Sequence, residues 1–270
     1  MQGERMGMDE TKAGDIEMAY TISGEGHPLV LIQGLTATID WWDPAFIAGL
    51  SKRYRVLAFD NRGAGRTEAP DGDFSVEQFA DDTSNLMEAL GIEKAYVLGY
   101  SLGGMIAQEL ALRHPEKVEK LILCSTNCGA GNWVVCDKEV LAVLTDRSGT
   151  PRDLFDRFCT VMFDRAWIKA NRDQLDEFKR RYLIAPTSDH NAARQFMTTV
   201  KFDTADRLGD IGVPALVLTG ADDLLIPPEN SRIIAGALPD ARLKEYPGAG
   251  HGFLYQCRDE FLADVIEFLG

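Results

Sequence analysis

Residues 97–108 read VLGYSLGGMIAQ, an apolar run followed by a serine flanked by glycines and then by a helix-forming segment. Gly99 and Gly103 lie two positions before and two positions after Ser101, which is a G-x-S-x-G pattern. Such a serine, on a sharp turn from a strand into a helix, presents its hydroxyl clear of the sheet, and the strained turn needs small neighbours. The simpler interpretation is a tight turn without chemistry. Partners elsewhere in the chain distinguish the two interpretations.

Strand-like apolar runs alternate with helical patterns on both sides of this stretch. The runs that predict strands are residues 16–22, 29–33, 55–60, 95–99, 121–125, 215–219 and 242–246. From Leu29 onward most of these runs are continuously apolar, which is typical of strands covered on both faces. The segments that predict helices are residues 75–90, 102–113, 228–238 and 257–269. The alternation indicates an α/β fold with a mostly parallel sheet flanked by helices.

The alternation stops between residues 126 and 207. This stretch has helical and loop-like patterns without a clear strand, and aromatic and methionine side chains are spread through it. It follows one expected strand and precedes another, so a helical insertion into one domain fits better than a separate tandem domain. We therefore predict an α/β core of residues 1–125 and 208–270, with a helical insertion of residues 126–207.

Charge and cysteine content limit the partners and the compartment. The 270-residue chain has a formal net charge of −14, which repels nucleic acid and anionic membrane surfaces and disfavours both as partners. It has no run of 18 apolar residues, and its first residues lack the apolar core of a signal peptide. Five cysteines without a C-x-x-C pair favour free thiols over a disulfide framework or a zinc site. We expect a cytoplasmic protein, and a monomer and a homodimer are both compatible with the sequence.

A serine nucleophile needs a general base, and one histidine is well placed for that role. His251 follows the expected strand at residues 242–246, within the segment GAGHGF, whose glycines let a loop fold back over the sheet edge. The other three histidines lie at a strand entry, at a helix end and in the inserted segment. The pattern therefore predicts His251 as the base, against the alternative of a turn histidine without a special role.

The base in turn needs a carboxylate that orients it. Asp222 and Asp223 both follow the expected strand at residues 215–219, and spacing alone does not separate them. Either aspartate lies between Ser101 and His251 in the chain, which is the order expected for a nucleophile elbow in such a sheet.

Two backbone N–H groups are candidates for an oxyanion hole. The N–H of Leu102 lies at the start of the expected helix, where partial positive charge favours an oxyanion. The loop after the strand at residues 29–33 reads Gln33-Gly34-Leu35-Thr36, and Gly34 permits close approach of its backbone. We predict the Leu35 N–H as the second donor.

Four large side chains of the inserted segment are candidates for a substrate pocket: Trp133, Phe158, Met162 and Trp167. The simpler interpretation is that they pack the insertion onto the core. A helical cover over the sheet edge would also exclude water and shape an apolar cavity. The pattern therefore favours small, largely apolar substrates, and the negative net charge favours neutral ones over dianions.

These motifs resemble those of the α/β-hydrolase superfamily. The resemblance implies that Asp223, the third residue after Gly220, is the acid of a Ser-His-Asp triad, and that residues 126–207 form the family's cap. Two positions depart from the usual pattern: Gln33 stands where a histidine is usual, and Thr67 where a serine is usual. The resemblance covers nearly the whole chain, through PLVLIQG, DNRGAGRT, GYSLGG, VPALVLTGADD and GAGHGF in this order.

Within the superfamily, residues 69–118 are similar to small carboxylesterases and 3-oxoadipate enol-lactonases. Dehalogenases and epoxide hydrolases have an aspartate at the position of Ser101, and C–C hydrolases of meta-cleavage products usually have a more glycine-rich oxyanion loop. The resemblance therefore implies a serine hydrolase that cleaves carboxylic esters through an acyl-enzyme, without a metal or a cofactor.

Other functions are compatible with the same residues. An enol-lactone type lactonase or a cofactor-free perhydrolase would use the same triad, and a homologue that only binds a ligand would keep the fold without turnover. A dinucleotide-binding fold is disfavoured, because the segments that begin at Gly63 and Gly248 both lack the last glycine of G-x-G-x-x-G.

Overall fold

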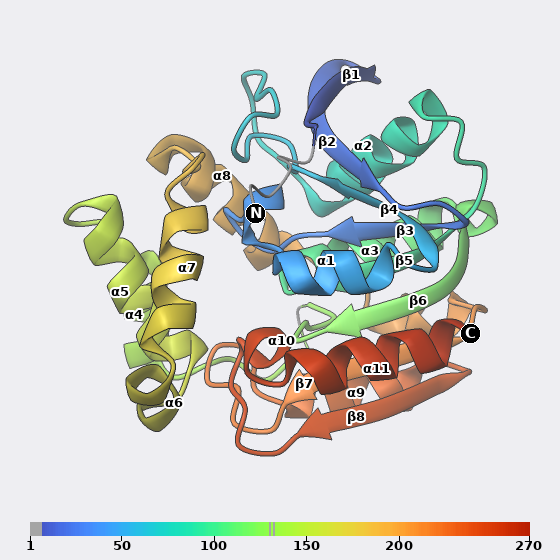
Figure 1. The fold of residues 1–270 in the computed structure, drawn as a ribbon. Helices are drawn as coiled ribbons and strands as arrows, with labels where there is room; N and C mark the ends of the chain where they lie inside the picture. Colours follow the sequence, from blue (N-terminus) through green and yellow to red (C-terminus); the bar gives the residue numbers. More distant parts are fainter. Residues whose placement is uncertain (1–6, 130, 132) are drawn as a thin grey trace.

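The computed structural model describes residues 7–129, 131 and 133–270, and one eight-stranded sheet forms its centre (Figure 1). The order across the sheet is β1-β2-β4-β3-β5-β6-β7-β8. The β1–β2 and β2–β4 pairs are antiparallel, and every pair from β4 to β8 is parallel. This topology confirms the predicted mostly parallel sheet. The strands are β1 (Asp9–Ala13), β2 (Ile16–Ser23), β3 (His27–Ile32), β4 (Tyr54–Phe59), β5 (Ala95–Tyr100), β6 (Val118–Cys124), β7 (Ala215–Gly220) and β8 (Ala241–Tyr246).

The burial of the strands follows their sequence patterns. All six residues of β7 are buried, as a continuously apolar strand in the middle of a covered sheet requires. Strand β1 lies at the sheet edge, has the polar sequence DETKA and pairs with β2. The sequence patterns did not predict β1, because an exposed edge strand needs no apolar side chains.

Helices of the core cover both faces of the sheet. Helices α2, α3 and α9 bury Phe79, Ile106 and Ile234 in one apolar cluster, whereas α1 and α11 bury Phe46 and Phe261 in the cluster on the opposite face. The sequence patterns missed the seven-residue α1, which Asp43 caps through hydrogen bonds from two backbone N–H groups. These helices are α1 (Pro44–Leu50), α2 (Val76–Ala89), α3 (Leu102–Arg113), α9 (Glu229–Ala237), α10 (Phe253–Gln256) and α11 (Arg258–Leu269), with 3-10 turns at Ile39–Trp41 and Pro115–Lys117.

The described residues between β6 and β7 form five further helices. They lie beyond the sheet on the side to which the arrows of β6 and β8 point (Figure 1). Phe155, Phe178 and Tyr182 of this segment form an apolar cluster with Trp41 of the core. A β-bridge between Gly129 and Asp203 joins its two ends. The elements are α4 (Lys138–Thr145), α5 (Pro151–Met162), α6 (Arg165–Ala170), α7 (Arg172–Tyr182) and α8 (Asp189–Lys201), followed by a 3-10 turn at Ala205–Asp210.

Candidate active site

Ser101 lies on the turn between β5 and α3, with φ 56° and ψ −120°. This backbone conformation is strained for any residue except glycine. A Cβ atom on Gly103 would lie 2.0 Å from the carbonyl oxygen of Ile32, and one on Gly99 would lie 2.2 Å from the carbonyl oxygen of Gly103. The close approach of three backbone segments therefore requires both glycines and leaves the Ser101 side chain at the edge of the sheet.

Asp223 and His251 lie against each other beyond the ends of β7 and β8. The Nδ1 atom of His251 is 2.8 Å from Oδ2 of Asp223, and both side chains are buried. The other carboxylate oxygen of Asp223 accepts hydrogen bonds from the backbone N–H groups of Leu225 and Ile226, each at 2.9 Å. Asp222, the alternative that spacing left open, is exposed. The fold therefore brings Asp223, and not Asp222, to the histidine.

The loop that carries His251 is held by its neighbours. The buried hydroxyl of Tyr100 donates to the carbonyl oxygen of His251 at 2.9 Å, and burial raises the pKa of this hydroxyl well above its ordinary value, so it stays protonated. The N–H of Gly252 donates to the carbonyl oxygen of Met162 at 2.9 Å. A Cβ atom on Gly250 would lie 2.7 Å from the same oxygen. The glycines beside His251 therefore allow the end of α5 to approach.

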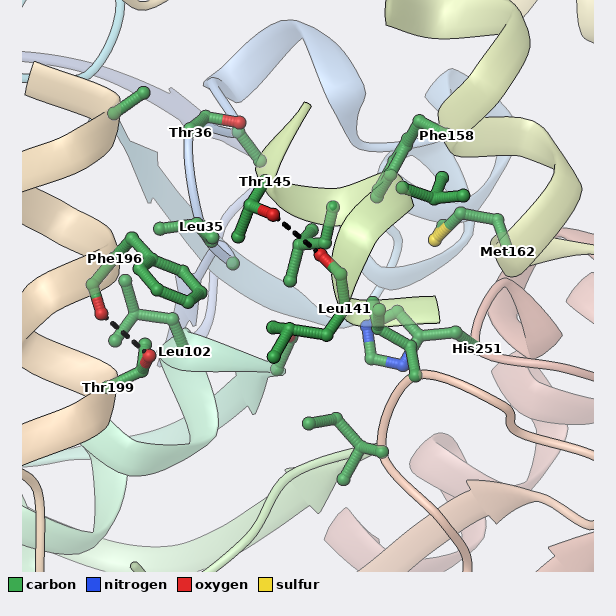
Figure 2. Close-up of a pocket in the computed structure, with 18 of the residues that line it drawn as sticks. Leu35, Thr36, Leu102, Leu141, Thr145, Phe158, Met162, Phe196, Thr199 and His251 are labelled. Carbon is green, nitrogen blue, oxygen red and sulfur yellow. Dashed lines mark hydrogen bonds between the residues drawn. The ribbon is translucent and has the colours of Figure 1, made fainter. Parts of the chain in front are cut away.

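Ser101 and His251 line one cavity of about 480 Å³. Residues of the segment between β6 and β7, among them Leu141, Phe158 and Phe196, form much of its wall (Figure 2). Among the predicted pocket residues, Trp133, Phe158 and Met162 also line it. Helices α4 and α8 supply further apolar side chains that sequence patterns did not single out, because such residues equally serve to pack helices. These are Leu141, Leu144, Phe196 and Val200.

The prediction that Trp167 lines this pocket is wrong. Trp167 stacks on Phe163, with ring centroids 4.6 Å apart, and the two line a separate depression of about 260 Å³. Phe163 occupies the space beside Gly252, where an added Cβ atom would lie 2.1 Å from its ring. Phe163 packs against the loop that carries His251. Trp167 in α6 packs on Phe163 and therefore does not line the cavity.

The two predicted oxyanion donors both lie on the cavity wall. Among the hydrogen bonds between described residues, neither the Leu35 N–H nor the Leu102 N–H has an acceptor. A Cβ atom on Gly34 would lie 3.1 Å from Cβ of Ser101, so the loop passes close to the serine. Gln33, which replaces the usual histidine, is buried and accepts the Gly34 N–H through Oε1 at 3.0 Å. The departure in sequence is therefore compatible with a hydrogen-bonded loop.

The second departure, Thr67, also forms hydrogen bonds. Its hydroxyl donates to the carbonyl oxygen of Asp60 at 2.7 Å and accepts the Ala19 N–H at 3.0 Å. The buried carboxylate of Asp60 accepts the N–H groups of Ile39 and Arg66. Burial raises the pKa of Asp60 to about 6, although these hydrogen bonds and the nearby Arg66 guanidinium act to lower it.

Within the described ranges, no group of three or more His, Cys, Asp or Glu side chains is placed to hold a metal ion. All five cysteines are free. Every described helix is too short or too polar to cross a lipid bilayer.

Known proteins resemble this chain over almost its whole length. A family model described as alpha/beta hydrolase fold matches residues 27–256. A protein of Azorhizobium caulinodans named "Putative carbamate hydrolase RutD" is 30% identical, over 97% of this chain and 98% of its own length.

Two solved structures are similar to the fold described above. A hydrolase from Pseudomonas aeruginosa PA01 has a TM-score of 0.85 and 28% identity, over 100% of both chains. The enol-lactonase from Burkholderia xenovorans LB400 has a TM-score of 0.83 and 29% identity, over 97% of this chain and 99% of its own. From its fold, its serine turn and the match to the family model, we conclude that this chain belongs to the α/β-hydrolase family of enzymes.

Proposed function

We propose that this protein is a serine hydrolase that cleaves carboxylic esters of small, largely apolar substrates. The observation that carries the proposal is the position of Ser101, on a strained turn at the wall of an apolar cavity that His251 also lines. His251 in turn contacts the buried Asp223 carboxylate. Nucleophile, base and orienting acid are the three groups that serine hydrolysis needs.

In the proposed mechanism, Oγ of Ser101 attacks the ester carbonyl while Nε2 of His251 takes the hydroxyl proton. Asp223 accepts the Nδ1–H of His251, which selects the tautomer and stabilises the imidazolium. The Leu35 and Leu102 N–H groups bind the oxyanion, each contributing roughly 3 kcal/mol to the stabilisation of the transition state. His251 then protonates the leaving alcohol.

The same groups carry out the second half of the reaction. His251 removes a proton from water, the water attacks the acyl-enzyme carbonyl, and the carboxylic acid leaves as Ser101 recovers its proton. Each step uses side chains and backbone groups of this chain, so the proposed mechanism requires no metal or cofactor.

The charges on the cavity wall support a neutral substrate. Arg147 is paired with Asp189 at 2.7 Å, and Asp146 is paired with Arg157 at 3.4 Å. A substrate carboxylate would therefore have to compete with an existing partner for Arg147, the one arginine or lysine among the described lining residues. One structural relative is named an enol-lactonase, and this pairing disfavours an enol-lactone that carries a carboxylate. The cavity volume suits a small organic ester.

We also propose that the enzyme works in the cytoplasm. Three of its five free cysteines, Cys124, Cys128 and Cys159, are buried. Free thiols are typical of a reducing compartment. A determination of the native location by fractionation of cells that produce the protein tests this proposal.

The test compares wild type with Ser101→Ala on substrates that share one leaving group. The set contains 4-nitrophenyl esters with acyl chains of increasing length and a 4-nitrophenyl carbamate, because the relatives named RutD suggest carbamates. Simple lactones and peracid formation from hydrogen peroxide and a carboxylic acid are measured beside them. We expect the highest kcat/KM for neutral aliphatic esters and a loss of kcat of roughly 10⁶-fold in the variant.

Each other result has a definite meaning. Turnover at the background rate in both proteins would favour a homologue that only binds ligands. Preferred hydrolysis of carbamates or lactones, lost in Ser101→Ala, would keep the nucleophile but replace the ester as substrate. Retention of more than a tenth of the wild-type rate by a correctly folded Ser101→Ala would overturn the assignment of Ser101. A fluorophosphonate probe provides an independent check, since it should label wild type and not the variant.

A further inference from the structure

The loop that carries the Leu35 N–H contains a strained turn. The N–H of Ala37 donates to the carbonyl oxygen of Gly34 at 3.2 Å, so residues 34–37 form a four-residue turn. Thr36, its third residue, has φ 61°, whereas Leu35 before it is not in the left-handed region. This is the pattern of a type II turn, in which the third position favours glycine. A β-branched threonine there is strained and needs support from its surroundings.

The support comes from Gln195 in α8, 159 residues further along the chain. Its Oε1 atom accepts the N–H of Thr36 at 2.8 Å. Its Nε2 atom donates to the carbonyl oxygen of Arg62 at 3.0 Å. The side chain is completely buried, and both ends of its amide are used. Gln195 therefore connects the inserted segment, the turn at Thr36 and the loop after β4.

A second side chain of the inserted segment holds the other side of Thr36. The hydroxyl of Thr187 donates to the carbonyl oxygen of Thr36 at 2.9 Å, and its oxygen accepts the N–H of Gly65 at 3.3 Å. The N–H and the C=O of Thr36 are thus both bound by residues that lie between β6 and β7. Figure 2 shows Leu35 and Thr36 close together at the wall of the cavity.

The Thr36 N–H shares a peptide plane with the Leu35 carbonyl. The Leu35 N–H lies in the adjoining plane, with the Gly34 carbonyl. If Thr36 relaxed to negative φ, the Leu35–Thr36 plane would rotate, the turn at residues 34–37 would change type, and the adjoining plane would lose the support that fixes its orientation. An oxyanion donor contributes only when it is held in place before the reaction, because the gain comes from preorganisation. We propose that Gln195 is a positioning residue of the ester hydrolase, which holds the strained turn so that Leu35 presents its N–H to the oxyanion. This inference rests on the proposed function.

The principal test is Gln195→Met, which keeps the volume of the side chain but removes both hydrogen bonds. We expect kcat on the best ester to fall by roughly 10- to 100-fold with KM changed less than threefold, because the loss acts in the transition state. A boronic acid that forms a tetrahedral adduct with Ser101 should bind more weakly by a similar factor. The affinity for the product acid should stay the same.

Rescue separates positioning from general packing. Glycine adopts positive φ without strain, so the double variant Gln195→Met/Thr36→Gly should have a clearly higher kcat than Gln195→Met alone. Gln195→Glu keeps the acceptor for the Thr36 N–H and should retain more activity than Gln195→Met. If Gln195→Met does not fold, Gln195→Glu is compared with wild type instead. Thr198→Val is the matched control, since the buried Thr198 hydroxyl donates only to the backbone carbonyl of Gln195 in the same helix, and its loss leaves both hydrogen bonds of the Gln195 side chain intact.

Several results would overturn the inference. They are wild-type kcat in Gln195→Met, an equal loss in Thr198→Val, or lower activity in Gln195→Glu than in Gln195→Met. The inference would also be overturned if Gln195→Met bound the boronic acid as tightly as wild type does and the added Thr36→Gly did not raise kcat. These results are distinguishable from a failure of the proposed function, because in that case wild type itself would hydrolyse esters only at the background rate or less well than another substrate class, or Ser101→Ala would keep its ester turnover.

Discussion

The carboxylate of Asp223 lies 2.8 Å from Nδ1 of His251, although the two residues are 28 positions apart in the chain. Two backbone N–H groups bind the second oxygen of Asp223, so the oxygen that faces the imidazole cannot turn away without breaking them. The exposed Asp222 has no such environment. The surroundings of the two adjacent carboxylates therefore distinguish Asp223 from Asp222 as the partner of His251.

Asp223→Asn should lower kcat on the best ester by roughly 10⁴-fold, because an amide cannot hold the imidazole in the correct tautomer as a carboxylate does. Asp222→Asn should change kcat less than twofold. Steady-state kinetics on both variants, with circular dichroism to verify folding, measure the difference. Equal losses in the two variants would contradict the assignment of Asp223.

Ser101→Gly should be more stable than Ser101→Ala. Glycine adopts the observed φ of 56° without strain, whereas alanine keeps the strain and both variants lack the hydroxyl. The energy gained by relieving the strain exceeds the entropic cost of glycine's greater freedom in the unfolded chain. We therefore expect the free energy of unfolding of Ser101→Gly to exceed that of Ser101→Ala by about 1 kcal/mol. Urea denaturation of the two inactive variants measures it, and a more stable alanine variant would show that the turn is unstrained.

Phe158→Ala should shift the preference of the enzyme toward longer acyl chains. Phe158 lines the cavity and packs against Trp41, so its removal extends the apolar space. The ratio of kcat/KM between long and short esters should rise about tenfold, the effect of one or two methylene groups in an apolar pocket. Trp167→Ala is the control, because Trp167 lies outside the cavity. If Trp167→Ala alone changed the preference for acyl-chain length, Trp167 and not Phe158 would line the acyl site.

Asp60 should make the fold more stable in mild acid. Burial raises the pKa of Asp60 to about 6, so the folded protein binds the proton more tightly than the unfolded chain does. The stabilisation is complete below the unfolded pKa and is lost as the pH rises through about 6, a total of about 3 kcal/mol.

The measurement compares the free energy of unfolding of wild type and Asp60→Asn between pH 4 and pH 7. The advantage of wild type over the variant should shrink as the pH rises in this range, since asparagine does not titrate. A constant or growing advantage would show that the pKa of Asp60 is not raised. Arg66 and Asp40, the charged side chains that act on the pKa of Asp60, remain the same in both proteins.

Local patterns predicted most of the core. Continuous apolar runs are read directly as covered strands, and β3 to β7 all lie where these runs placed them, to within a few residues. Strand β1 was missed because its side chains face solvent and only its backbone pairing makes it a strand. Helix α1 was missed because seven residues hold too short a pattern to identify.

The sequence by itself predicted the serine turn, since the spacing of Gly99, Ser101 and Gly103 and the change from an apolar run to a helical pattern are local. The contact that excludes a side chain at Gly103 comes from Ile32 in another strand and is seen only in the tertiary structure. Only the tertiary structure separated Asp223 from Asp222 by their contacts, excluded Trp167 from the cavity and brought Gln195 to Thr36. The physical reason is the range of the interactions. Periodicity acts between neighbours in the chain, whereas burial and hydrogen bonding depend on groups that folding brings together from distant positions, 28 apart for Asp223 and His251 and 159 apart for Gln195 and Thr36.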